Sequence, residues 1–357
     1  MTSWMIRAGS AGEREDWALE TGCSGAGFGE VAPLYDADRR DDVVDAVNAV
    51  YSDSGDGAVR NFAAQLWALR GRMAVGDLVV MPLKRTPSIA LGIITSDYEY
   101  LADEPDIQRR HVRRIDWKVT DLGRARVKQD LLYSLGAFST ICQIKRNDAE
   151  FRLRTCIERG VDPGARNSSV AAQAAAAPPA EVTIGQEEAD DSEANIPVDL
   201  ARVAADSIAS RVIEVFAGHK MESLVAEILR ANDYVCMEHG AGTDDGIDLV
   251  AGKGLLGLEA PRIIVQVKSQ ASSVDSPTVQ QLHGALKMHD ADQGLLVAWG
   301  GLTKAARKLV DSHRFAVRVW EADDVVNLIE RHYLDLSASI RKDLPLRQIW
   351  TLAEDAG

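Results

Sequence analysis

The sequence, 357 residues long, is poor in cysteine, in aromatic residues and in long hydrophobic runs. Its cysteines lack the paired spacing of a zinc site or a disulfide framework, which favours a reducing, cytoplasmic setting. No apolar run reaches the roughly 18 residues that a membrane-spanning helix needs, and the first residues lack the apolar stretch of a secretory signal. We therefore expect a soluble cytoplasmic protein that has no membrane partner. The four cysteines are Cys23, Cys142, Cys156 and Cys236.

Positive charge is also scarce, with 40 Lys and Arg against 54 Asp and Glu and a formal net charge of −14. Such a balance disfavours non-specific coating of nucleic acid, which depends on cationic side chains that displace counterions. The deficit is uneven, however: the net charge is −2 in residues 1–160, −7 in 161–200 and −5 in 201–357. Half of the excess lies in the short middle segment, so the flanking parts can still carry local basic patches.

Residues 161–199 combine an alanine run, a Pro-Pro pair and an acidic cluster, and they contain no aromatic residue. A segment of this composition cannot bury enough apolar surface to offset the entropy lost on ordering. We therefore predict a flexible linker between two domains, residues 1–160 and 200–357.

The two predicted domains differ in their patterns. Short apolar runs at 4–9, 77–83 and 89–95 predict strands in the first, with an amphipathic helix over 59–73. The second alternates helices and strands, which predicts an α/β layer fold. Its helices are expected at 200–216, 221–229, 278–288 and 303–313, and its strands at 247–251, 262–269, 294–299 and 316–320.

Three polar residues interrupt the apolar strands of the second domain. Gln266 and Lys268 lie on one face of the strand at 262–269, because side chains alternate along a strand. Asp248 begins the preceding strand, so the three side chains converge if the two strands are neighbours. A carboxylate, an amide oxygen and an ammonium group suit metal-assisted attack of water on a phosphodiester. An Asp that opens a strand and a Lys near a strand end are also common structural residues, so the pattern alone leaves both interpretations open.

Further stretches around these residues occur in a characteristic order. The region resembles the Mrr-type branch of the PD-(D/E)xK nuclease superfamily, in which the second acidic residue is replaced to give D…QxK. The resemblance covers roughly residues 205–335 and implies a central mixed sheet flanked by helices, although Trp299 stands where many relatives have threonine. The stretches are MESLVAEIL (221–229), DDGIDLVA (244–251), VQVKS (265–269), VQQLHGAL (279–286) and DQGLLVAWGGLTKAARKL (292–309).

The resemblance implies a role for each matching residue. Asp248 becomes the main ligand of Mg²⁺ or Mn²⁺, Gln266 the second ligand, and Lys268 the catalytic lysine. Glu222 matches the helix glutamate that completes the metal site in many members, with Glu227 as a competitor on the same helix.

Other polar residues near this core have less specific signals. Gln280 fits a phosphate contact or a plain helix surface, and Asp245 fits a turn or a metal ligand. The histidines lack paired ligand spacing, so we expect packing or surface roles for them. They are His219, His239, His283 and His289.

The first domain contains, in this order, the stretches SWMIRAG (3–9), GAGFGEV (25–31), GDLVVMPL (76–83), GIITSDYEY (92–100) and RRHVRRIDWKV (109–119). They give the domain a resemblance to the PUA-like group that includes EVE and related modified-base readers. It implies a mixed α+β domain with a PUA-like β-barrel, in which a flipped base stacks in an aromatic pocket. Core packing explains each aromatic residue equally well. The candidates for the pocket are Phe28, Tyr98, Tyr100 and Trp117, with Asp97 as an acceptor for the base edge.

The stretch 109–128 carries eight cations and two aspartates. Guanidinium groups suit phosphate contacts, whereas a solvated surface is the ordinary alternative. The candidates for contacts with the DNA backbone are Arg109, Arg110, Arg113, Arg114 and Lys118.

Together these features favour a modification-dependent, type IV-like restriction endonuclease of phage defence. It would recognise a modified base such as methylcytosine in double-stranded DNA and cleave with Mg²⁺, as a dimer or higher oligomer because one core cuts one strand. The alternatives are a non-catalytic modified-DNA-binding protein with a degenerate core, since an amide replaces a carboxylate, and a repair or RNA-directed nuclease. No Walker loop is present, so NTP-driven translocation within this chain is not expected.

Overall fold

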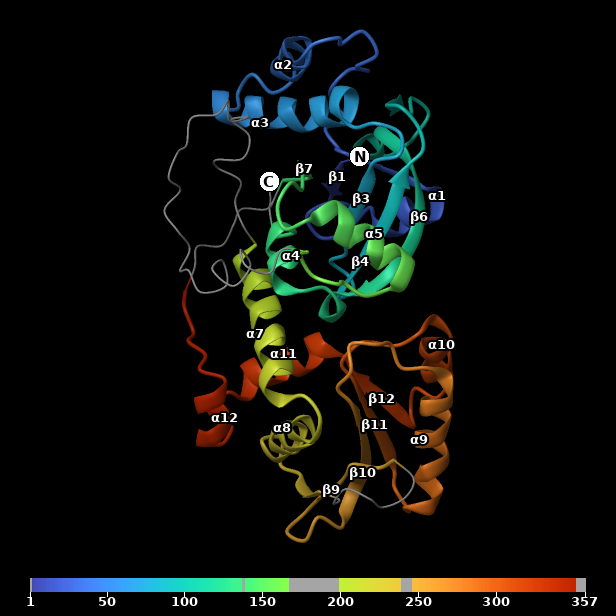
Figure 1. Cartoon of the computed structure of the whole chain (residues 1–357), viewed down its shortest axis with the longest axis vertical. Helices are drawn as coiled ribbons and strands as arrows, with labels where there is room; N and C mark the ends of the chain where they lie inside the picture. The colour runs from blue at the N-terminus through green and yellow to red at the C-terminus, as the bar shows by residue number, and fades with distance from the viewer. Residues whose placement is uncertain (1, 137–138, 167–198, 239–245, 351–357) are drawn as a thin grey trace. The chain divides into compact units, whose positions relative to one another are not determined.

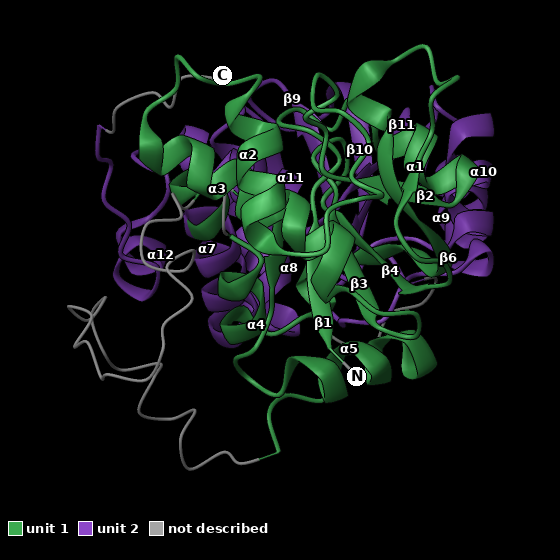
Figure 2. Cartoon of the chain, turned by 90° about the horizontal axis from the view of Figure 1, so that it is seen from above, with its two compact units in different colours: residues 1–203, 356 green, residues 204–355, 357 purple. Residues whose placement is uncertain are grey.

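The computed structural model describes residues 2–136, 139–166, 199–238 and 246–350. It divides into two compact units, residues 1–203 and 204–355 (Figures 1 and 2). Each unit folds around a sheet of its own. Most of the predicted linker, residues 167–198, lies outside the described residues.

The N-terminal unit is built on a sheet whose strands run in the order β2-β6-β4-β3-β1-β7, with β5 paired to β6. The β1–β3 pair is parallel, and the other described pairs of this sheet are antiparallel. The strands are β1 (Ser3–Ile6), β2 (Cys23–Gly25), β3 (Leu78–Pro82), β4 (Ser88–Ile94), β5 (Glu99–Tyr100), β6 (His111–Gly123) and β7 (Ile141–Gln143).

Two cores form on the two faces of this sheet because successive side chains of a strand point in opposite directions. Trp4 and Ile6 of β1 pack into a core with residues of α2 and α3. Met5 packs into a second core with residues of α4 and α5. The predicted helix at 59–73 is α3, continued by a π-helical turn at Ala68–Arg72. The helices are α1 (Glu15–Thr21), α2 (Arg40–Asn48), α3 (Asp56–Trp67), α4 (Gln129–Ser134) and α5 (Ala149–Arg159).

The predicted linker begins a few residues too early. Asp162 is buried and accepts hydrogen bonds of 2.8 and 2.6 Å from the guanidinium of Arg152. It also accepts one of 2.9 Å from the backbone N–H of Lys128. A buried ion pair with this many hydrogen bonds ties the chain after α5 to the N-terminal unit, and a reading of composition cannot detect it.

The C-terminal unit has the mixed α/β fold predicted from its sequence. Its sheet runs β12-β11-β10-β9-β8, parallel from β10 to β12 and antiparallel from β8 to β10. Each helix and strand predicted for this half is present, whereas β8, α11 and α12 were not predicted. The elements are α7 (Leu200–Phe216, which contains the boundary in sequence between the two units), α8 (His219–Arg230), β8 (Val235–Glu238), β9 (Leu249–Lys253), β10 (Glu259–Lys268), α9 (Ser276–Met288), β11 (Gln293–Ala298), α10 (Lys304–Ser312), β12 (Val317–Trp320), α11 (Ala322–His332) and α12 (Ala338–Asp343).

Helices cover both faces of this sheet, with α9 and α10 on one face and α8 on the other (Figure 1). Ile264 of β10 and Leu296 of β11 form a core with Leu282 of α9 and Ala306 of α10. Ile264, Gln266 and Lys268 alternate along β10 and therefore share this face. The packing of α9 thus decides which side of the sheet carries the polar residues of β10.

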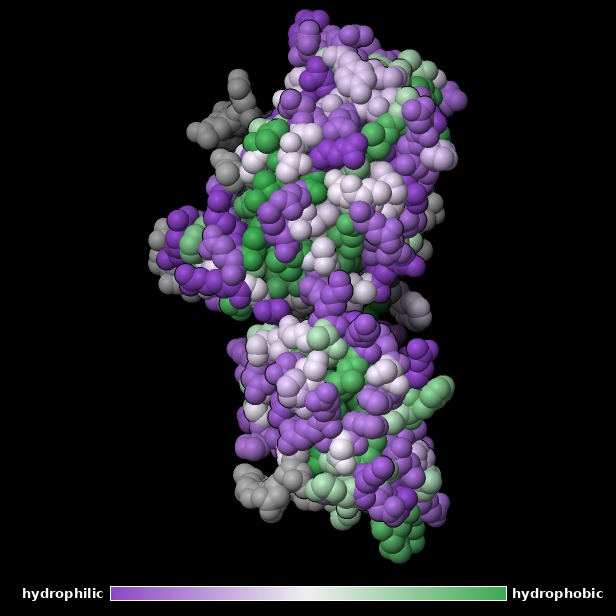
Figure 3. All heavy atoms as spheres, turned by 90° about the vertical axis from the view of Figure 1, so that its right-hand side faces the viewer, coloured by the Kyte–Doolittle hydropathy of each residue, from purple (hydrophilic) through white to green (hydrophobic). Residues whose placement is uncertain are grey.

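The turn between β9 and β10 is unusually apolar for a surface segment. Leu255 is 94% exposed, and Leu256 and Leu258 are also exposed. Figure 3 shows hydrophobic residues at the lower end of the view, where Figure 1 places this turn. Exposed apolar surface of this kind is characteristic of contact sites for another macromolecule. No helix among the described residues is long and apolar enough to cross a membrane.

Candidate active site

The register of the C-terminal sheet brings Asp248 and Gln266 together. Leu249 of β9 pairs with Val265 of β10, and the backbone N–H of Asp248 donates a hydrogen bond of 2.9 Å to the carbonyl of Val265. Asp248 therefore lies opposite Gln266 on the neighbouring strand. Lys268 follows two positions later on the same face, so the three residues occupy one end of the β9–β10 pair.

The carboxylate of Asp248 is fixed by the backbone of β10. Its Oδ2 accepts a hydrogen bond of 2.6 Å from the N–H of Val267. The side chain is half-buried, and within the described residues Oδ1 has no partner. One oxygen is thus used for orientation, and the other remains available as a ligand.

Gln266 is 1% exposed, and its Oε1 has no hydrogen-bond partner among the described residues. Its Nε2 lies against Gly246, where a Cβ would come within 2.7 Å of that nitrogen. A buried amide oxygen without a partner is costly, and such an oxygen calls for a specific explanation. A cation beside Asp248 supplies one, because it would satisfy this oxygen.

Lys268 ends β10 and is half-buried. Its carbonyl accepts a hydrogen bond of 2.9 Å from the backbone N–H of Trp299. Trp299 is itself buried, so the departure from threonine at this position is accommodated in the core.

The first turn of α8 lies close to the end of β10. The N–H of Gly218, which precedes α8, donates a hydrogen bond of 3.0 Å to Oγ of Ser269, the residue after Lys268. Glu222 belongs to this first turn, and its Oε1 lies 2.8 Å from Nδ1 of His219.

Glu227, the competitor of Glu222, is held by structural contacts. It forms an ion pair of 3.0 Å with Arg230 and accepts a hydrogen bond of 3.2 Å from the backbone N–H of Ser337. Glu227 therefore has structural partners, and the choice of Glu222 as the glutamate of the site stays a prediction.

The donor set fits a hard divalent cation. Within the described ranges no group of three His, Cys, Asp or Glu side chains is arranged for a metal ion, but the amide oxygen of Gln266 falls outside that set of residue types. A carboxylate oxygen and a buried amide oxygen are ligands that Mg²⁺ and Mn²⁺ accept. Asp244, Asp245 and His239 lie outside the described residues.

The sequence reasoning missed Gln281 of α9. A Cβ at Gly246 would lie 3.3 Å from Nε2 of Gln281 and 2.7 Å from Nε2 of Gln266, so both side chains approach this point. Gln280 and Gln281 are both exposed. Gln280 and Gln281 are adjacent in the sequence, and the rotation of α9 about its axis decides which of them lies near Gln266.

The other histidines do not join this site. The ring of His283 stacks on that of His313, with centroids 4.0 Å apart and planes inclined by 20°. Burial, reinforced by the neighbouring His313, lowers the pKa of His283. His289 is exposed.

The expectation that Arg113 contacts DNA is wrong. Arg113 is 2% exposed, and its guanidinium donates to the carbonyls of Leu69, Ser96 and Arg70 at 2.6, 3.0 and 3.3 Å. Its donors are therefore committed to holding three backbone segments together. Arg114 points to the opposite face of β6 and is exposed.

The remaining cations of this stretch have partners within the unit. Arg114 pairs with Glu99 at 2.9 Å, Lys118 pairs with Asp116, and Arg110 donates to the carbonyl of Glu104 at 3.1 Å. Arg109 pairs with Asp106 at 2.9 Å. The positive charge of the stretch is therefore partly neutralised, and a contact with phosphate has to compete with these partners.

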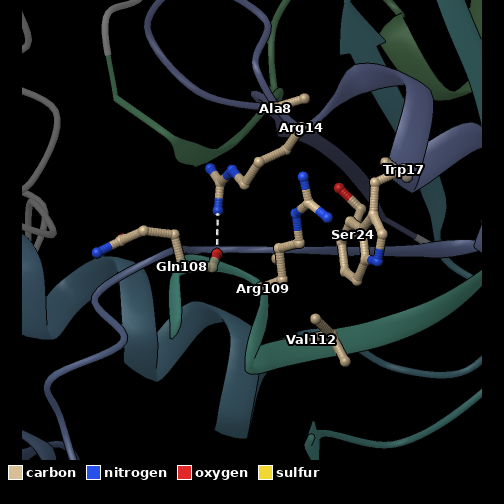
Figure 4. A pocket seen from close by; sticks show the side chains of 9 residues that line it. Ala8, Arg14, Trp17, Ser24, Gln108, Arg109 and Val112 are labelled. Atoms are coloured by element: carbon tan, nitrogen blue, oxygen red, sulfur yellow. Dashed lines mark hydrogen bonds between the residues drawn. The ribbon is translucent and has the colours of Figure 1, made fainter. Parts of the chain in front are cut away.

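Arg109 also lies over the ring of Trp17, 5.4 Å from its centroid. Figure 4 shows the two beside Arg14 and Gln108 in a narrow pocket that leaves no space for a water molecule. Arg14 fills part of the pocket and donates to the carbonyl of Gln108 at 2.7 Å. The pocket is closed by its own side chains in this conformation.

Tyr98 is a core residue, so the expectation that it stacks on a base is wrong. It is buried, and its hydroxyl lies 2.8 Å from Nδ1 of His111 and accepts a hydrogen bond of 3.1 Å from the N–H of Leu34. Burial lowers the pKa of His111 to about 4. Tyr100 is half-buried beside the same histidine, with ring centroids 5.0 Å apart, and the exposed Tyr35 accepts a hydrogen bond of 2.9 Å from its backbone N–H.

The other candidates for the base pocket are dispersed. Phe28 packs on Tyr51 and Phe62, and Trp117 donates from Nε1 to the carbonyl of Ala18 at 2.8 Å. Asp97 is exposed, 3.7 Å from the guanidinium of Arg113. The structure therefore brings Tyr98 and Tyr100 together, but it leaves Phe28 in a separate aromatic group and anchors Trp117 on α1.

Comparison with known protein families defines the class of the C-terminal unit. Residues 213–329 match the model of the Mrr-type restriction endonuclease catalytic domain. The C-terminal unit therefore contains a restriction endonuclease domain, and the resemblance expected for this region is confirmed. Residues 4–135 match a domain family of unknown function. No curated protein matches the chain.

Solved structures with a likeness to the chain share 13% sequence identity with it. The MspJI restriction endonuclease, solved in complex with a 27-mer oligonucleotide, has a TM-score of 0.32, with 96% of this chain and 79% of that chain covered. AspBHI, a DNA modification-dependent restriction endonuclease, has a TM-score of 0.31, with 82% and 74% covered. A protein of unknown function, AF1548, has a TM-score of 0.23, with 28% of this chain and 56% of that chain covered, so the chain matches about half of its length.

Proposed function

We propose that the chain is a modification-dependent restriction endonuclease that hydrolyses DNA phosphodiester bonds with Mg²⁺ or Mn²⁺. The observation that carries this proposal is the buried Oε1 of Gln266, which lies opposite Asp248 and has no hydrogen-bond partner among the described residues. A restriction endonuclease domain in the same region makes DNA its substrate class.

Each site residue has a distinct role in this proposal. Asp248 and Gln266 hold the cation, and Glu222, from the first turn of α8, completes its ligands. When bound, the cation supplies Lewis-acid polarisation of a phosphate oxygen and an acidified water. Lys268, at the end of β10, orients the attacking water and offsets the charge of the phosphate.

The N-terminal unit is proposed to read a modified base such as methylcytosine. The support is local: Tyr100 is half-buried, Tyr35 beside it is exposed, and the carboxylate of Asp97, 3.7 Å from the guanidinium of Arg113, is exposed and can accept hydrogen bonds from a base edge. Arg114 and Lys118, exposed on the outer face of β6, are the residues best placed to contact phosphates. A PUA-like or EVE-like identity of this unit stays a prediction.

A second copy of the chain is required for cleavage of both strands, since one core holds one set of catalytic residues. We assign this contact to the exposed leucines of the β9–β10 turn and to the adjoining edge strand β8, where Met237 is also exposed. An edge strand offers unpaired backbone groups, and the leucines offer apolar area. We further infer a cytoplasmic role in defence against foreign DNA.

The test is a cleavage assay with methylated, hydroxymethylated and unmodified duplexes and Mg²⁺. We expect the wild type to cut a modified duplex and Lys268→Ala to lose at least about 100-fold in rate, while Lys308→Ala, an exposed lysine of α10, cuts normally. Full cleavage by Lys268→Ala would overturn the proposal.

The neutral Gln266 also favours a second candidate, a modified-DNA-binding protein without catalysis, because an amide binds cations more weakly than a carboxylate. Binding of modified duplexes with no turnover in Mg²⁺ or Mn²⁺ would establish it.

A further inference from the structure

A second cavity lies in the N-terminal unit, where the start of α5 meets β1 and β7. Its volume is about 530 Å³, which is in the range of small-molecule sites. None of the residues discussed for base reading lines it. Its polar lining includes Ser3, Gln143, Lys145, Asp148, Glu150 and Arg166.

Ser3 contributes a buried hydroxyl that nothing in the described structure satisfies. The residue is 2% exposed, and its Oγ has no hydrogen-bond partner among the described residues. Ser3 shares a face of β1 with Met5, which packs in the core with Ala149 and Leu153 of α5. The hydroxyl therefore faces α5, at the floor of the cavity.

The N-terminus of α5 lacks the side-chain capping hydrogen bond that an aspartate at this position usually makes. Asp148 occupies the position from which an aspartate side chain ordinarily caps a helix, but it makes no capping hydrogen bond. Its carboxylate instead accepts a hydrogen bond of 2.9 Å from the backbone N–H of Arg166. Within the part of the chain that the structure describes, the N–H groups of Glu150 and Phe151 thus have no side-chain acceptor, and the positive end of the helix dipole faces the cavity.

The charged side chains around this opening favour an anion. The carboxylates of Asp148 and Glu150 are paired with Arg166 and Arg154, each at 3.4 Å. Lys145 adds a further positive charge to the lining. The guanidinium of Arg166 also lies over the ring of Phe151, 4.5 Å from its centroid, which holds it at the mouth.

We propose that this cavity binds a phosphate group carried by a small ligand of mononucleotide size. The phosphate accepts hydrogen bonds from the N–H groups of Glu150 and Phe151 and from the hydroxyl of Ser3, and Lys145 contributes positive charge. The proposal is independent of the nuclease assignment, because every residue involved belongs to the N-terminal unit.

Calorimetric titration of the full chain in EDTA tests the proposal with four probes: inorganic phosphate, deoxycytidine monophosphate, deoxycytidine and a duplex oligonucleotide. We expect the monophosphate to bind, inorganic phosphate to compete with it, and deoxycytidine not to bind. Ser3→Ala and Lys145→Gln should each weaken the monophosphate about tenfold. Arg60→Gln, an exposed arginine of α3, is the charge-matched control and should bind normally.

Thermal unfolding separates a ligand contact from a structural one. Without ligand, Ser3→Ala should melt at the same temperature as the wild type or higher, because an unsatisfied buried hydroxyl is removed. The proposal is overturned if neither phosphate probe binds at millimolar concentration, if only the duplex binds, or if Ser3→Ala binds the monophosphate as tightly as the wild type.

Discussion

The carboxylate of Asp248 accepts a hydrogen bond of 2.6 Å from the backbone N–H of Val267, a residue of the strand that also carries Gln266 and Lys268. The strand that presents two residues of the site therefore also orients the third. A shift of one residue in the β9–β10 register would break this bond and would turn Asp248 to the opposite face. The geometry of the site is thus a property of strand pairing.

Replacing Gln266 with Glu should make the free energy of unfolding depend on whether Mg²⁺ is bound. A carboxylate at this buried position, opposite Asp248, costs about 1–3 kcal/mol of unfolding free energy in EDTA, because desolvation and the like charge oppose its ionisation. Mg²⁺ should restore the stability and act at lower concentration than in the wild type. Thermal unfolding with and without Mg²⁺ checks this, and Gln266→Leu should stay folded in both conditions and not cleave. Equal melting temperatures of Gln266→Glu in EDTA and Mg²⁺ would contradict the placement of the cation.

Substitution of Glu222 should change the cleavage rate, whereas substitution of Glu227 should change the melting temperature. Glu222→Gln should lower the cleavage rate by at least about tenfold, because it removes a charged ligand, and leave the melting temperature unchanged. Glu227→Gln should lower the melting temperature, since it weakens the contacts to Arg230 and Ser337, and leave the cleavage rate intact. The reverse pattern would assign the site to Glu227.

Substitution of Arg113 and of its neighbour Arg114 in β6 should have different effects on stability and on DNA binding. Arg113→Ala should destabilise the N-terminal unit by about 3 kcal/mol or more, because one buried and two partly buried carbonyls lose their donor. Arg114→Ala should change stability by about 1 kcal/mol at most and reduce the salt dependence of DNA binding by about one phosphate contact. Hydrogen exchange of the two units and binding assays at several salt concentrations measure the two effects. An unchanged salt dependence in Arg114→Ala would remove this residue from the interface.

The N-terminal unit should lose stability in mild acid through His111. Its pKa of about 4 in the folded unit lies below the ordinary value of 6.5, because burial disfavours the charged ring. The unfolded chain therefore binds the proton first, and stability present above pH 6.5 is lost as the pH falls towards 4. At pH 5 the loss amounts to about 2 kcal/mol. Scanning calorimetry at pH 5 and 7.5 checks this, and the pH dependence should be smaller in His111→Gln.

The leucines of the β9–β10 turn should control assembly. Changing Leu255 and Leu256 together to Ser should shift the chain to monomer without loss of folding, because both side chains are exposed. Light scattering measures the mass of the protein in solution. The monomeric variant should cut one DNA strand and cut the second strand only slowly. A monomeric wild type that cuts both strands would contradict the assignment.

The sequence predicted the site best where its residues lie on elements that are close together in the chain. Asp248, Gln266 and Lys268 lie on two strands joined by a short turn, and alternation along β10 was enough to place two of them on one face. Gln281 could not be distinguished from Gln280, because the rotation of α9 is set by its packing on the sheet. The short edge strand β8 was not predicted, because four residues, VCME, are too few to show an alternating pattern, and most of these side chains are exposed.

The main errors of the sequence-based predictions concern charged residues that are buried in the structure. Alternation along β6 indicates that Arg113 and Arg114 point to opposite faces, yet both were expected at the surface. An arginine becomes an internal residue only when several carbonyls converge on it, and those of Leu69, Arg70 and Ser96 come from distant segments. The same holds for Asp162, whose partner Arg152 is on α5.

Gly246 has a consequence for how the protein tolerates change. It contributes no functional group, yet its φ of 71° is unfavourable for other residues, and any Cβ would come within 2.7 Å of the amide of Gln266. In a library of all single substitutions, this position should therefore rank with the catalytic residues in loss of activity. A scan that scores activity alone would mistake the shape of the backbone for chemistry, and only a parallel score for folded protein would tell them apart.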